Sequence, residues 1–538
     1  MGENNLTLPA ILESASSKNS TRIVFTFPDK TYITFAVFYN RVELLSEFLL
    51  RNGIGKGDCV AIFDDHFINL PIIYFALARI GAITIPLLPS ISPEELEFLM
   101  KQNQVVAVFA RPSQSALFKS VRFPQLKFFI NILSFRFEAL QEDSVSQKVE
   151  KQIDKIKKAA LELVKPEELT PPPQISADDE IQRLLLPDLN GEWQTYRYSH
   201  RHLISSAKML TDTLALNSQS KLLFLLPFYF NLTISLGVLG PSLKNYHVIF
   251  ARLPETLEEL QALLDEVQPT QVIIEVGLLE KLLTEYLRPI PPNPLLQKSA
   301  KIFSFLRKKI LGSRVKFLQQ REWLICTNFL PASLALQQFL KEESIKATFL
   351  FGVYETTSAL ITGKPDAHPN WIEGQVIGGI ETKIEPTDGQ VGKLWVKGPN
   401  VVTTEKTKIH DGFVELPVMG EQSETVLKIS GFRSTLLKPG PHKLIDARVI
   451  EVNLRLLPEI EDALIFQQNQ EIILRVLPAP EFLLTHQQEM ETRLAARIHA
   501  FLSEQFPISV PISRIHIETH PFPKTLLGQT LRYLPSTK

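Results

Sequence analysis

The stretch G-I-G-K-G-D-C-V-A-I-F, from Gly53 to Phe63, predicts a glycine-marked turn that leads into a fully apolar strand. A helical pattern follows from Asn69 to Ile80, and Gly81 is placed to end it. Further apolar strands are predicted from Ala82 to Leu88 and from Val105 to Ala110. The pattern therefore alternates buried strands with helices.

A second helix is predicted between the last two of these strands, in S-P-E-E-L-E-F-L-M. Ser92 is placed to cap its N-terminus, and Pro93 occupies the first helical position, where its missing N–H costs nothing. Apolar strands that alternate with helices are typical of a doubly wound parallel sheet with helices on both faces. The fold class predicted from this half of the chain is α/β.

Composition narrows the class of protein. The 538 residues exceed one ordinary domain, so at least two packed units are expected. A net charge of −1 argues against a nucleic-acid binder. Cys59 and Cys326 lie in apolar strand-like contexts, which predicts buried unreactive thiols and a cytoplasmic protein. The first residues lack the basic and apolar regions of a signal peptide.

Two segments raise the question of a membrane. Leu222 to Leu243 is apolar enough to suggest a spanning helix, but Pro227 and Pro241 interrupt it, so a buried strand, a turn and a core helix are expected. Ser144 to Val164 reads as a charged helix in which Glu and Asp alternate with Lys. A solvated surface helix is favoured over one that contacts acidic lipid, and no transmembrane segment is predicted.

The stretch P-K-T-L-L-G-Q-T-L-R, from Pro523 to Arg532, resembles the C-terminal signature of the adenylate-forming (AMP-binding) superfamily, P-x-T-x-x-G-K-x-x-R. This superfamily includes the acyl-CoA synthetases and long-chain fatty-acid–CoA ligases. The resemblance implies a catalytic Lys that steers the substrate carboxylate and the α-phosphate, and Gln529 stands at its position. A neutral amide carries no charge to offset the anion that develops in such a reaction.

The resemblance extends from about Pro9 to Arg532 and implies a domain map. A large N-terminal domain of doubly wound sheets would span residues 1–429, with a small barrel-like subdomain at about 371–429. A small mobile α+β C-terminal domain would span residues 430–538. The segment S-G-F-R-S-T-L-L-K, which begins at Ser430, resembles the hinge between them. Limited proteolysis is expected to cut there, because modest interdomain interfaces permit motion.

The phosphate-binding loop of the family aligns with L-P-D-L-N-G-E-W-Q-T, residues 186–195. Of its glycines only Gly191 remains, and Gln194 stands at the position of its Lys. Asp188 and Glu192 place negative charge where a polyphosphate would lie, which is repulsive at a site for anions. This comparison predicts a loop that connects its strands without binding ATP.

The motif L-F-G-V-Y-E-T-T, residues 350–357, resembles the family's G-Y-G-x-T-E-T-S. Phe351 replaces the Tyr that stacks on adenine, and stacking could survive that change. Tyr354 replaces the Thr that contacts the α-phosphate, and its bulk would intrude there. Glu355 keeps the position of the magnesium-binding carboxylate, although a locally paired Glu is the simpler interpretation.

Two further nucleotide contacts are altered. In D-G-F-V-E-L-P-V-M-G, Val418 replaces the Asp that holds the ribose hydroxyls, and valine cannot accept a hydrogen bond. In the hinge-like segment Thr435 replaces Asp, and Phe432 takes the Arg position, with Arg433 one residue late. A displaced Arg could still reach a phosphate.

The acyl pocket is predicted from L-L-P-F-Y-F, which resembles the family's L-P-x-x-H. Phe230 takes the His position, and Tyr229 precedes it. An ordinary apolar core strand is an equally good interpretation.

Two functions remain open. The first is a pseudoenzyme with no assigned cofactor, which binds a fatty acyl group or a protein partner. The second is an active acyl-CoA or acyl-carrier-protein ligase that uses ATP and magnesium. In the second case Lys438, Lys443 or Lys524 would supply the missing charge.

Overall fold

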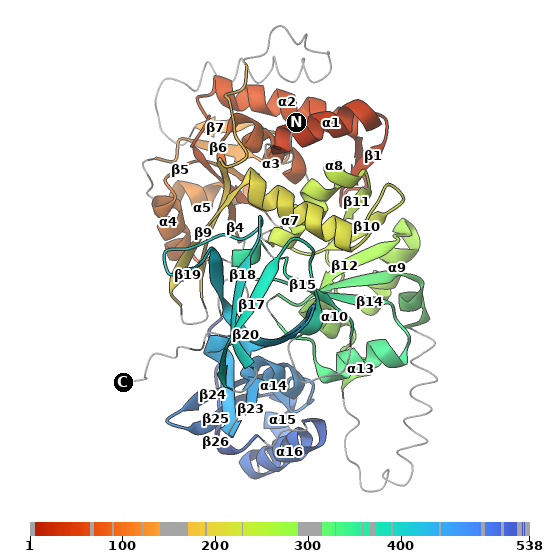
Figure 1. Ribbon diagram of the computed structural model, residues 1–538, viewed down its shortest axis with the longest axis vertical. Helices are drawn as coiled ribbons and strands as arrows, with labels where there is room; N and C mark the ends of the chain where they lie inside the picture. Colours follow the sequence, from red (N-terminus) through yellow and green to blue (C-terminus); the bar gives the residue numbers. More distant parts are fainter. Residues whose placement is uncertain are drawn as a thin grey trace.

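The structure is a computed structural model (Figure 1). It describes residues 6–64, 69–88, 91–120, 123, 125–139, 171–188, 191–228, 230–288, 315–328, 330–357, 359–365, 372–388, 391–440, 443–485, 490–506, 510–524, 530 and 532. The predictions for Gln529, for Tyr229 and for the charged segment 144–164 lie outside these residues.

The predicted alternation of strands and helices is confirmed. The strands are β3 (Cys59–Phe63), β4 (Ile83–Leu87) and β5 (Val105–Ala110), which pair in parallel with β3 in the middle. Helix α3 (Leu70–Ile80) follows β3 and ends at Gly81, whose φ of 71° favours glycine. Both faces of these strands are buried, as parallel sheets require.

The predicted cap of helix α4 (Pro93–Gln102) is also present. Ser92 Oγ accepts a hydrogen bond from Glu95 N at 3.2 Å, and Glu95 Oε2 accepts one from Ser92 N at 3.1 Å. This reciprocal capping box fixes the start of the helix.

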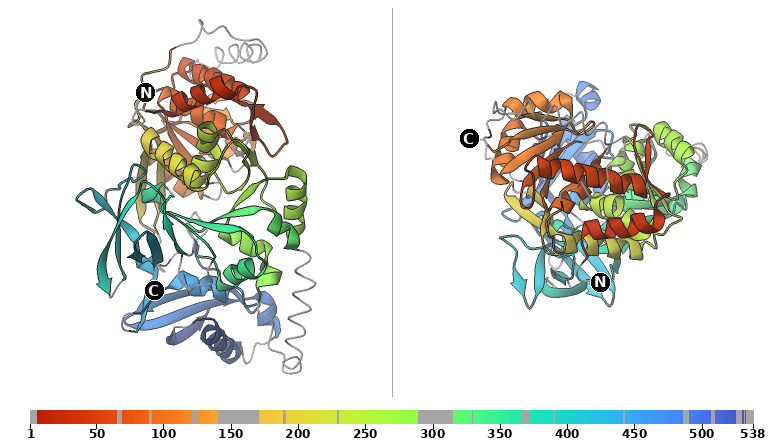
Figure 2. Two further views of the ribbon diagram at one scale, coloured as in Figure 1. Left: turned by 45° about the vertical axis from the view of Figure 1, so that its right-hand side comes forward. Right: turned by 90° about the horizontal axis from the view of Figure 1, so that it is seen from above.

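The first sheet has seven strands in the order β7-β6-β5-β3-β4-β8-β9. Its last two strands, β8 (Glu180–Pro187) and β9 (Trp193–Ser199), form an antiparallel hairpin. Its other edge is formed by β6 (Phe128–Asn131) and β7 (Phe137–Ala139). Helices α1 (Leu8–Asn19), α2 (Phe35–Arg51) and α3 lie together on one side, at the red end of the molecule in Figures 1 and 2.

A larger sheet of fourteen strands crosses the middle of the molecule. Its parallel part has the order β1-β11-β10-β12-β13-β14, and antiparallel strands β15, β16, β21, β20, β18 and β17 continue it. The strands expected as a barrel-like subdomain are thus hydrogen-bonded into this sheet. The bounds are β1 Ile23–Thr26, β2 Tyr32–Thr34, β10 Lys221–Leu225, β11 His247–Phe250, β12 Gln271–Glu275, β13 Glu322–Cys326, β14 Ala347–Phe351, β15 Ile361–Gly363, β16 Ile372–Val376, β17 Glu381–Asp388, β18 Val391–Lys397, β19 Ile409–His410, β20 Phe413–Ser423 and β21 Val426–Phe432.

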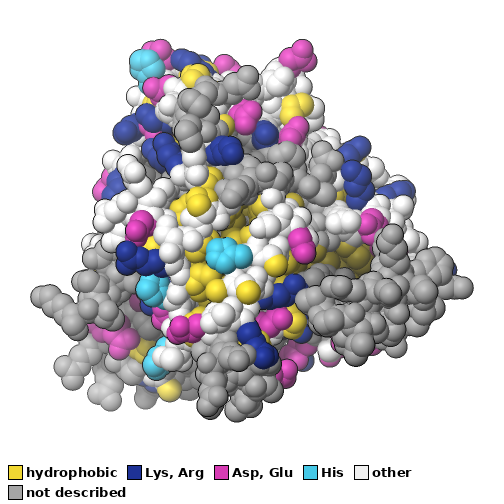
Figure 3. Space-filling view, turned by 90° about the horizontal axis from the view of Figure 1, so that it is seen from below, with side chains coloured by type: hydrophobic (Ala, Val, Ile, Leu, Met, Phe, Trp, Pro, Cys, Tyr) yellow, Lys and Arg dark blue, Asp and Glu magenta, His cyan; other side chains and the backbone are white. Residues whose placement is uncertain are grey.

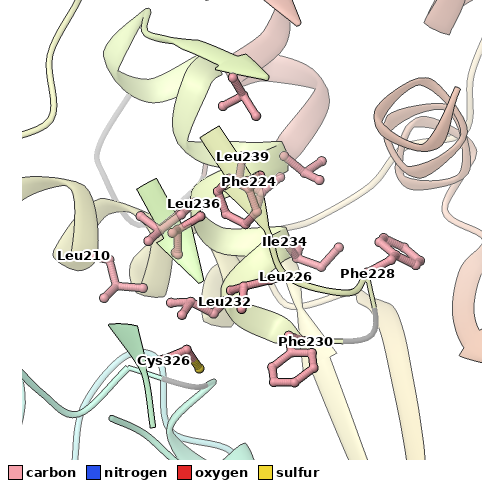
Figure 4. Packing of buried hydrophobic residues seen from close by; sticks show 14 of the residues in the cluster. Leu210, Phe224, Leu226, Phe228, Phe230, Leu232, Ile234, Leu236, Leu239 and Cys326 are labelled. Atoms are coloured by element: carbon pink, nitrogen blue, oxygen red, sulfur yellow. The ribbon is translucent and has the colours of Figure 1, made fainter. Parts of the chain in front are cut away.

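The apolar segment 222–243 forms a strand, a turn and short helices, as expected. Strand β10 is followed by the π-helix η4 (Thr233–Leu239) and by α8 (Gly240–Lys244). Its leucines and phenylalanines pack in the main hydrophobic core (Figure 4). Among the described residues, no helix is long and apolar enough to span a bilayer.

The C-terminal domain has its own hydrophobic cluster around Ile450, Ile465 and Leu494. Its elements are β22 Leu436–Gly440, β23 Lys443–Asp446, α14 Ala447–Leu454, β24 Ile460–Gln468, β25 Glu471–Pro478, α15 Pro480–Thr485, α16 Met490–Gln505 and β26 Ile512–Ile517. The domain forms the blue end of the molecule in Figures 1 and 2, opposite α1 and α2. The face at this end shows hydrophobic side chains near its middle and charges of both signs around them (Figure 3). The domain boundary at Ser430 stays a prediction.

The remaining helices of the described residues lie between strands of the two sheets or lead into the C-terminal domain. They are η2 Pro112–Gln114, α5 Ser115–Ser120, α7 His200–Thr213, α9 Leu257–Val267, α10 Val276–Leu282, α11 Thr284–Leu287, η5 Lys316–Gln320, α13 Leu334–Glu342, η6 Tyr354–Thr356 and η7 Arg433–Thr435.

Candidate functional site

A cavity of about 500 Å³ lies between the β8–β9 hairpin, the end of β14, the segment 404–408 and the hinge-like segment. Its lining combines aromatic side chains with charges of both signs. The lining residues are Leu186, Pro187, Asp188, Gln194, Tyr196, Asn328, Gly352, Val353, Tyr354, Glu355, Thr404, Lys406, Thr407, Lys408, Glu415, Pro417, Phe432, Arg433, Ser434 and Arg448. A cavity of this size and composition can hold a small organic ligand.

The segment that aligns with the phosphate-binding loop is a tight hairpin turn. Asp188 N donates to Glu192 O at 2.9 Å, Gly191 N donates to Asp188 O at 3.0 Å, and Glu192 N donates to Asp188 Oδ1 at 3.0 Å. Gly191 has a φ of 82° and takes the left-handed position of the turn. These three amides are therefore engaged within the turn and not available to phosphate oxygens.

Charged side chains lie on either side of this turn. Asp188 lines the cavity, and Glu192 forms an ion pair with Lys406 of the opposite segment. Both partners of that pair are more than half exposed, so the pair contributes little to stability. Gln194 lies on β9 opposite Leu186 and lines the cavity.

Tyr354 and Glu355 enter the cavity from a 3₁₀ turn after β14. Asn400 fixes this turn, because its Nδ2 donates to Thr356 O at 2.6 Å and to Ala359 O at 3.0 Å. The ring of Tyr354 packs against Tyr196 of β9 with centroids 5.2 Å apart.

Glu355 is a buried carboxyl at the inner end of the cavity, 8% exposed. Burial raises its pKa to about 7, and a hydrogen bond with Tyr196 opposes that rise. Near neutral pH it can therefore hold or release a proton.

Phe351 and Val418 are core residues, 1% and 0% exposed, and neither lines the cavity. Phe351 makes an edge-to-face contact with Phe432, with centroids 6.4 Å apart. Their chain neighbours Gly352 and Pro417 line the cavity instead. Pro417 and Val418 are successive residues of β20, where side chains alternate between the two faces. An adenine ring in the cavity would not contact Phe351.

Arg433 lines the cavity but is already paired. Its Nη1 lies 2.6 Å from Glu415 Oε1, and its Nη2 donates to Leu416 O at 2.8 Å. Lys408 Nζ lies 3.8 Å from the other oxygen of Glu415, whose side chain is only 3% exposed. The cations at this wall are therefore balanced by a buried carboxylate.

Phe230, predicted to line an acyl pocket, lies outside this cavity. It is 6% exposed and packs with Leu226 and Leu232 in the main core, and it does not line this cavity (Figure 4). The acyl pocket predicted at Phe230 and Tyr229 stays a prediction.

Two described residues of the C-terminal signature, Lys524 and Arg532, make contacts within the fold. Arg532 Nη2 lies 2.9 Å from both carboxylate oxygens of Glu451, and its Nη1 donates to Ile465 O at 2.8 Å. Lys524 Nζ lies 3.3 Å from Asp462 Oδ2. Both side chains therefore fasten the end of the chain to the C-terminal domain.

Several lining residues escaped sequence reasoning. Tyr196, Asn328, Glu415 and Arg448 reach the cavity from separate elements, and no motif flagged them. One signal was available: Glu415 is a carboxylate within the otherwise apolar strand F-V-E-L-P-V. A carboxyl buried in such a run is accommodated either by a cationic partner or by staying protonated, so it marks a position to inspect.

The residues present do not fit a magnesium–triphosphate group. The amides of Asp188, Gly191 and Glu192 are bonded within the β8–β9 turn, and Asp188 adds negative charge. Among the residues that the structure describes, no cluster of three His, Cys, Asp or Glu could hold a metal ion. Glu355 alone would be a poor magnesium site, since several oxygen ligands are required.

Comparisons with known proteins agree with this geometry at the level of fold. Residues 12–181 match the model of the AMP-binding enzyme family. The putative acyl-CoA synthetase YngI of Bacillus subtilis (strain 168) is 25% identical over 258 residues, which cover 44% of this chain and 45% of that protein. The medium-chain fatty-acid–CoA ligase of Escherichia coli (strain K12) is 32% identical over 89 residues, 16% of this chain and 15% of that protein. The matches thus span less than half the length of these relatives.

Solved structures match over nearly the whole chain. The O-succinylbenzoate coenzyme A synthetase MenE of Bacillus subtilis, in complex with AMP, has a TM-score of 0.73 at 16% identity, with 98% of each chain covered. ATP-bound MatB of Rhodopseudomonas palustris has a TM-score of 0.72 at 15% identity, again with 98% of each chain covered. The fold is that of the adenylate-forming CoA ligases. The match to the AMP-binding enzyme family model over residues 12–181 confirms the resemblance, and the solved structures confirm the predicted α/β fold.

Proposed function

We propose that this chain is a catalytically degenerate acyl-CoA-synthetase-like protein that does not activate carboxylates with ATP. The main support is the β8–β9 turn, where the amides of Asp188, Gly191 and Glu192 donate to oxygens of Asp188 and Glu192 and where Asp188 lines the cavity. Transition-state charge at phosphorus needs preorganised donors, and these donors are already engaged. Gln529 at the position of the family's Lys removes a further positive charge.

The competing function is an active ligase with a rebuilt nucleotide site. It would need a replacement cation, and Lys524 is already paired with Asp462. Arg433 is paired with Glu415 in the same way. Both pairs would have to break before either cation could serve a phosphate, so the degenerate function is better supported. A cytoplasmic location belongs to the same proposal, since Cys59 and Cys326 are buried free thiols.

Carboxylate-dependent exchange of pyrophosphate into ATP is expected to be absent with fatty acids of any length. Titration calorimetry with ATP, with and without magnesium, is expected to show no binding. Gln529→Lys alone is expected not to restore exchange, because residues that act as a unit are strongly non-additive. A fatty-acid–CoA ligase assayed in parallel is the positive control. Exchange by the unmodified protein would exclude the proposal.

We also propose that the cavity still accepts an acyl group without ATP, since an apolar chain gains free energy by burial against Tyr196, Tyr354 and Val353. The melting temperature is expected to rise with fatty acids and to rise more for longer chains. Gln194→Trp, which fills the cavity, should abolish this rise, and Gln338→Trp on the exposed face of α13 should not. A flat response to every chain length would leave a protein partner as the remaining ligand class.

A further inference from the structure

Among the residues that the structure describes, two separate groups of contacts join the C-terminal domain to the rest of the chain. One surrounds Asp446, beside the hinge-like segment. The other is at the start of α13, where Leu334 N donates to Asn453 Oδ1 of α14 at 3.0 Å. The side chain of Leu334 packs in the hydrophobic cluster of the C-terminal domain. Attachment at two points restricts rotation more than attachment at one.

Asp446 holds the middle of the hinge-like segment at two residues. Its Oδ2 accepts hydrogen bonds from Phe432 N at 2.9 Å and from Thr435 Oγ1 at 2.7 Å. Its Oδ1 accepts one from Arg448 N at 2.9 Å, which caps α14. Asp446 is fully buried, so these bonds are shielded from water. Gly431 permits the close approach: its φ is 147°, and a Cβ there would overlap the Asp446 carboxylate.

Phe432 and Arg448 tie the same segment to both domains. The Arg448 guanidinium lies over the Phe432 ring, 4.3 Å from its centroid, and its Nη2 lies 3.3 Å from Asp446 Oδ2. Phe432 also makes an edge-to-face contact with Phe351 at the end of β14. Arg448 is 3% exposed, and a buried guanidinium that is stacked and paired is costly to displace.

Arg433 adds a link to the large sheet, through Glu415 and the carbonyl of Leu416 on β20. Ser430, where the resemblance implies a flexible joint, is 6% exposed and lies within β21. Thr435 is 2% exposed. Ser430 and Thr435 are therefore buried like core residues and Arg433 is paired, whereas a segment that moves readily has few such contacts.

We propose that the Asp446 contacts and the Asn453–Leu334 bond form a two-point clasp that keeps the two domains in one fixed arrangement. Phe432, Arg433 and Arg448 are then permanent walls of the cavity. The mobile C-terminal domain that the hinge resemblance implies is replaced by a rigid one. This inference does not depend on whether the chain turns over ATP.

The domain arrangement can be measured with two labels on the full chain. Glu258→Cys on α9 and Glu504→Cys on α16 are both exposed, whereas the native Cys59 and Cys326 are buried, so labelling is selective. Single-molecule energy transfer between these labels is expected to give one narrow distance distribution. That distribution should not change on addition of ATP with magnesium, of a fatty acid, or of coenzyme A. Two distances in the unmodified protein, or a shift with any of these ligands, would overturn the proposal.

Variants of the clasp test its residues. Asp446→Ala combined with Asn453→Ala is expected to broaden the distribution and to raise hydrogen exchange in residues 430–436 at least tenfold. Thr435→Val, which removes the hydrogen bonds of the Thr435 hydroxyl with Asp446, Phe432 and Arg448 and keeps the shape, should have the same effect to a smaller degree. Ser434→Ala, the exposed neighbour, is the matched control and should behave like the parent. If the double variant does not fold, the distance distributions of Thr435→Val and of the parent still test the proposal. An unchanged distribution in all clasp variants would contradict the assignment.

Discussion

Arg532→Ala is expected to destabilise the C-terminal domain by about 3–5 kcal/mol, the cost of leaving a buried charge without its partner. The side chains of Arg532 and Glu451 are 7% and 2% exposed, and both carboxylate oxygens are contacted. Glu451 Oε1 also accepts a hydrogen bond from Ile465 N at 2.9 Å. Loss of Arg532 therefore weakens strand β24 as well as the attachment of the C-terminal signature.

Urea unfolding gives the size of this loss, and hydrogen exchange of β24 gives its location. Arg532→Lys keeps the charge but not the two-point contact, so it should lie between the parent and Arg532→Ala. Arg514→Ala is the matched control, because its pair with Glu471 is about half exposed and should be worth less than about 1 kcal/mol. Equal effects at the two arginines would contradict the structural role assigned to Arg532.

The structural role of Arg532 explains why the signature keeps this arginine although its Lys is replaced, which a catalytic role would not explain. The C-terminal signature keeps Pro523 and Arg532 while Gln529 replaces its Lys. A residue that fastens the chain end is required by the fold whether or not ATP is used. The motif therefore predicts the fold well and the activity poorly.

Strands β3, β4 and β5 of the first sheet could be predicted to within about a residue, because short apolar runs between turn residues are typical of buried strands, whereas its strands β6 to β9 were not predicted. Strand β3 and helix α3 are examples. The candidate site was harder to predict from the sequence. Gln194, Tyr354, Glu355 and Arg433 line one cavity, but their partners are set by strand pairing across the fold.

Strand geometry explains the other difference between the predicted site residues and those that line the cavity. Phe351 and Val418 face the core, and Gly352 and Pro417 take the cavity side. A motif match alone does not show which of two neighbouring residues faces the cavity and which faces the core. The paired state of Arg433 is similarly hidden, since Glu415 lies eighteen residues earlier on a neighbouring strand.

Glu355→Gln and Glu280→Gln are each expected to stabilise the protein at pH 8 and to have little effect at pH 5. Burial raises the pKa of both carboxyls to about 7. Between their usual value of 4.5 and 7, the folded protein holds protons that the unfolded chain has released, so stability falls as pH rises through this window. The full loss is about 3 kcal/mol per group, reached above pH 7.

Glutamine imitates the protonated carboxyl, keeps an acceptor for Ser333 N, which donates to Glu280 Oε1 at 2.7 Å, and cannot ionise. Urea midpoints at pH 5 and pH 8 should therefore separate each variant from the parent only at the higher pH. The exposed Glu258→Gln controls for loss of one surface carboxylate. A gain of the same size at both pH values would mean that packing, and not the ionisation of a buried acid, separates variant from parent. A ligand that lowers the pKa of Glu355 would release a proton on binding, so calorimetry in buffers of different ionisation enthalpy would also detect occupation of the cavity.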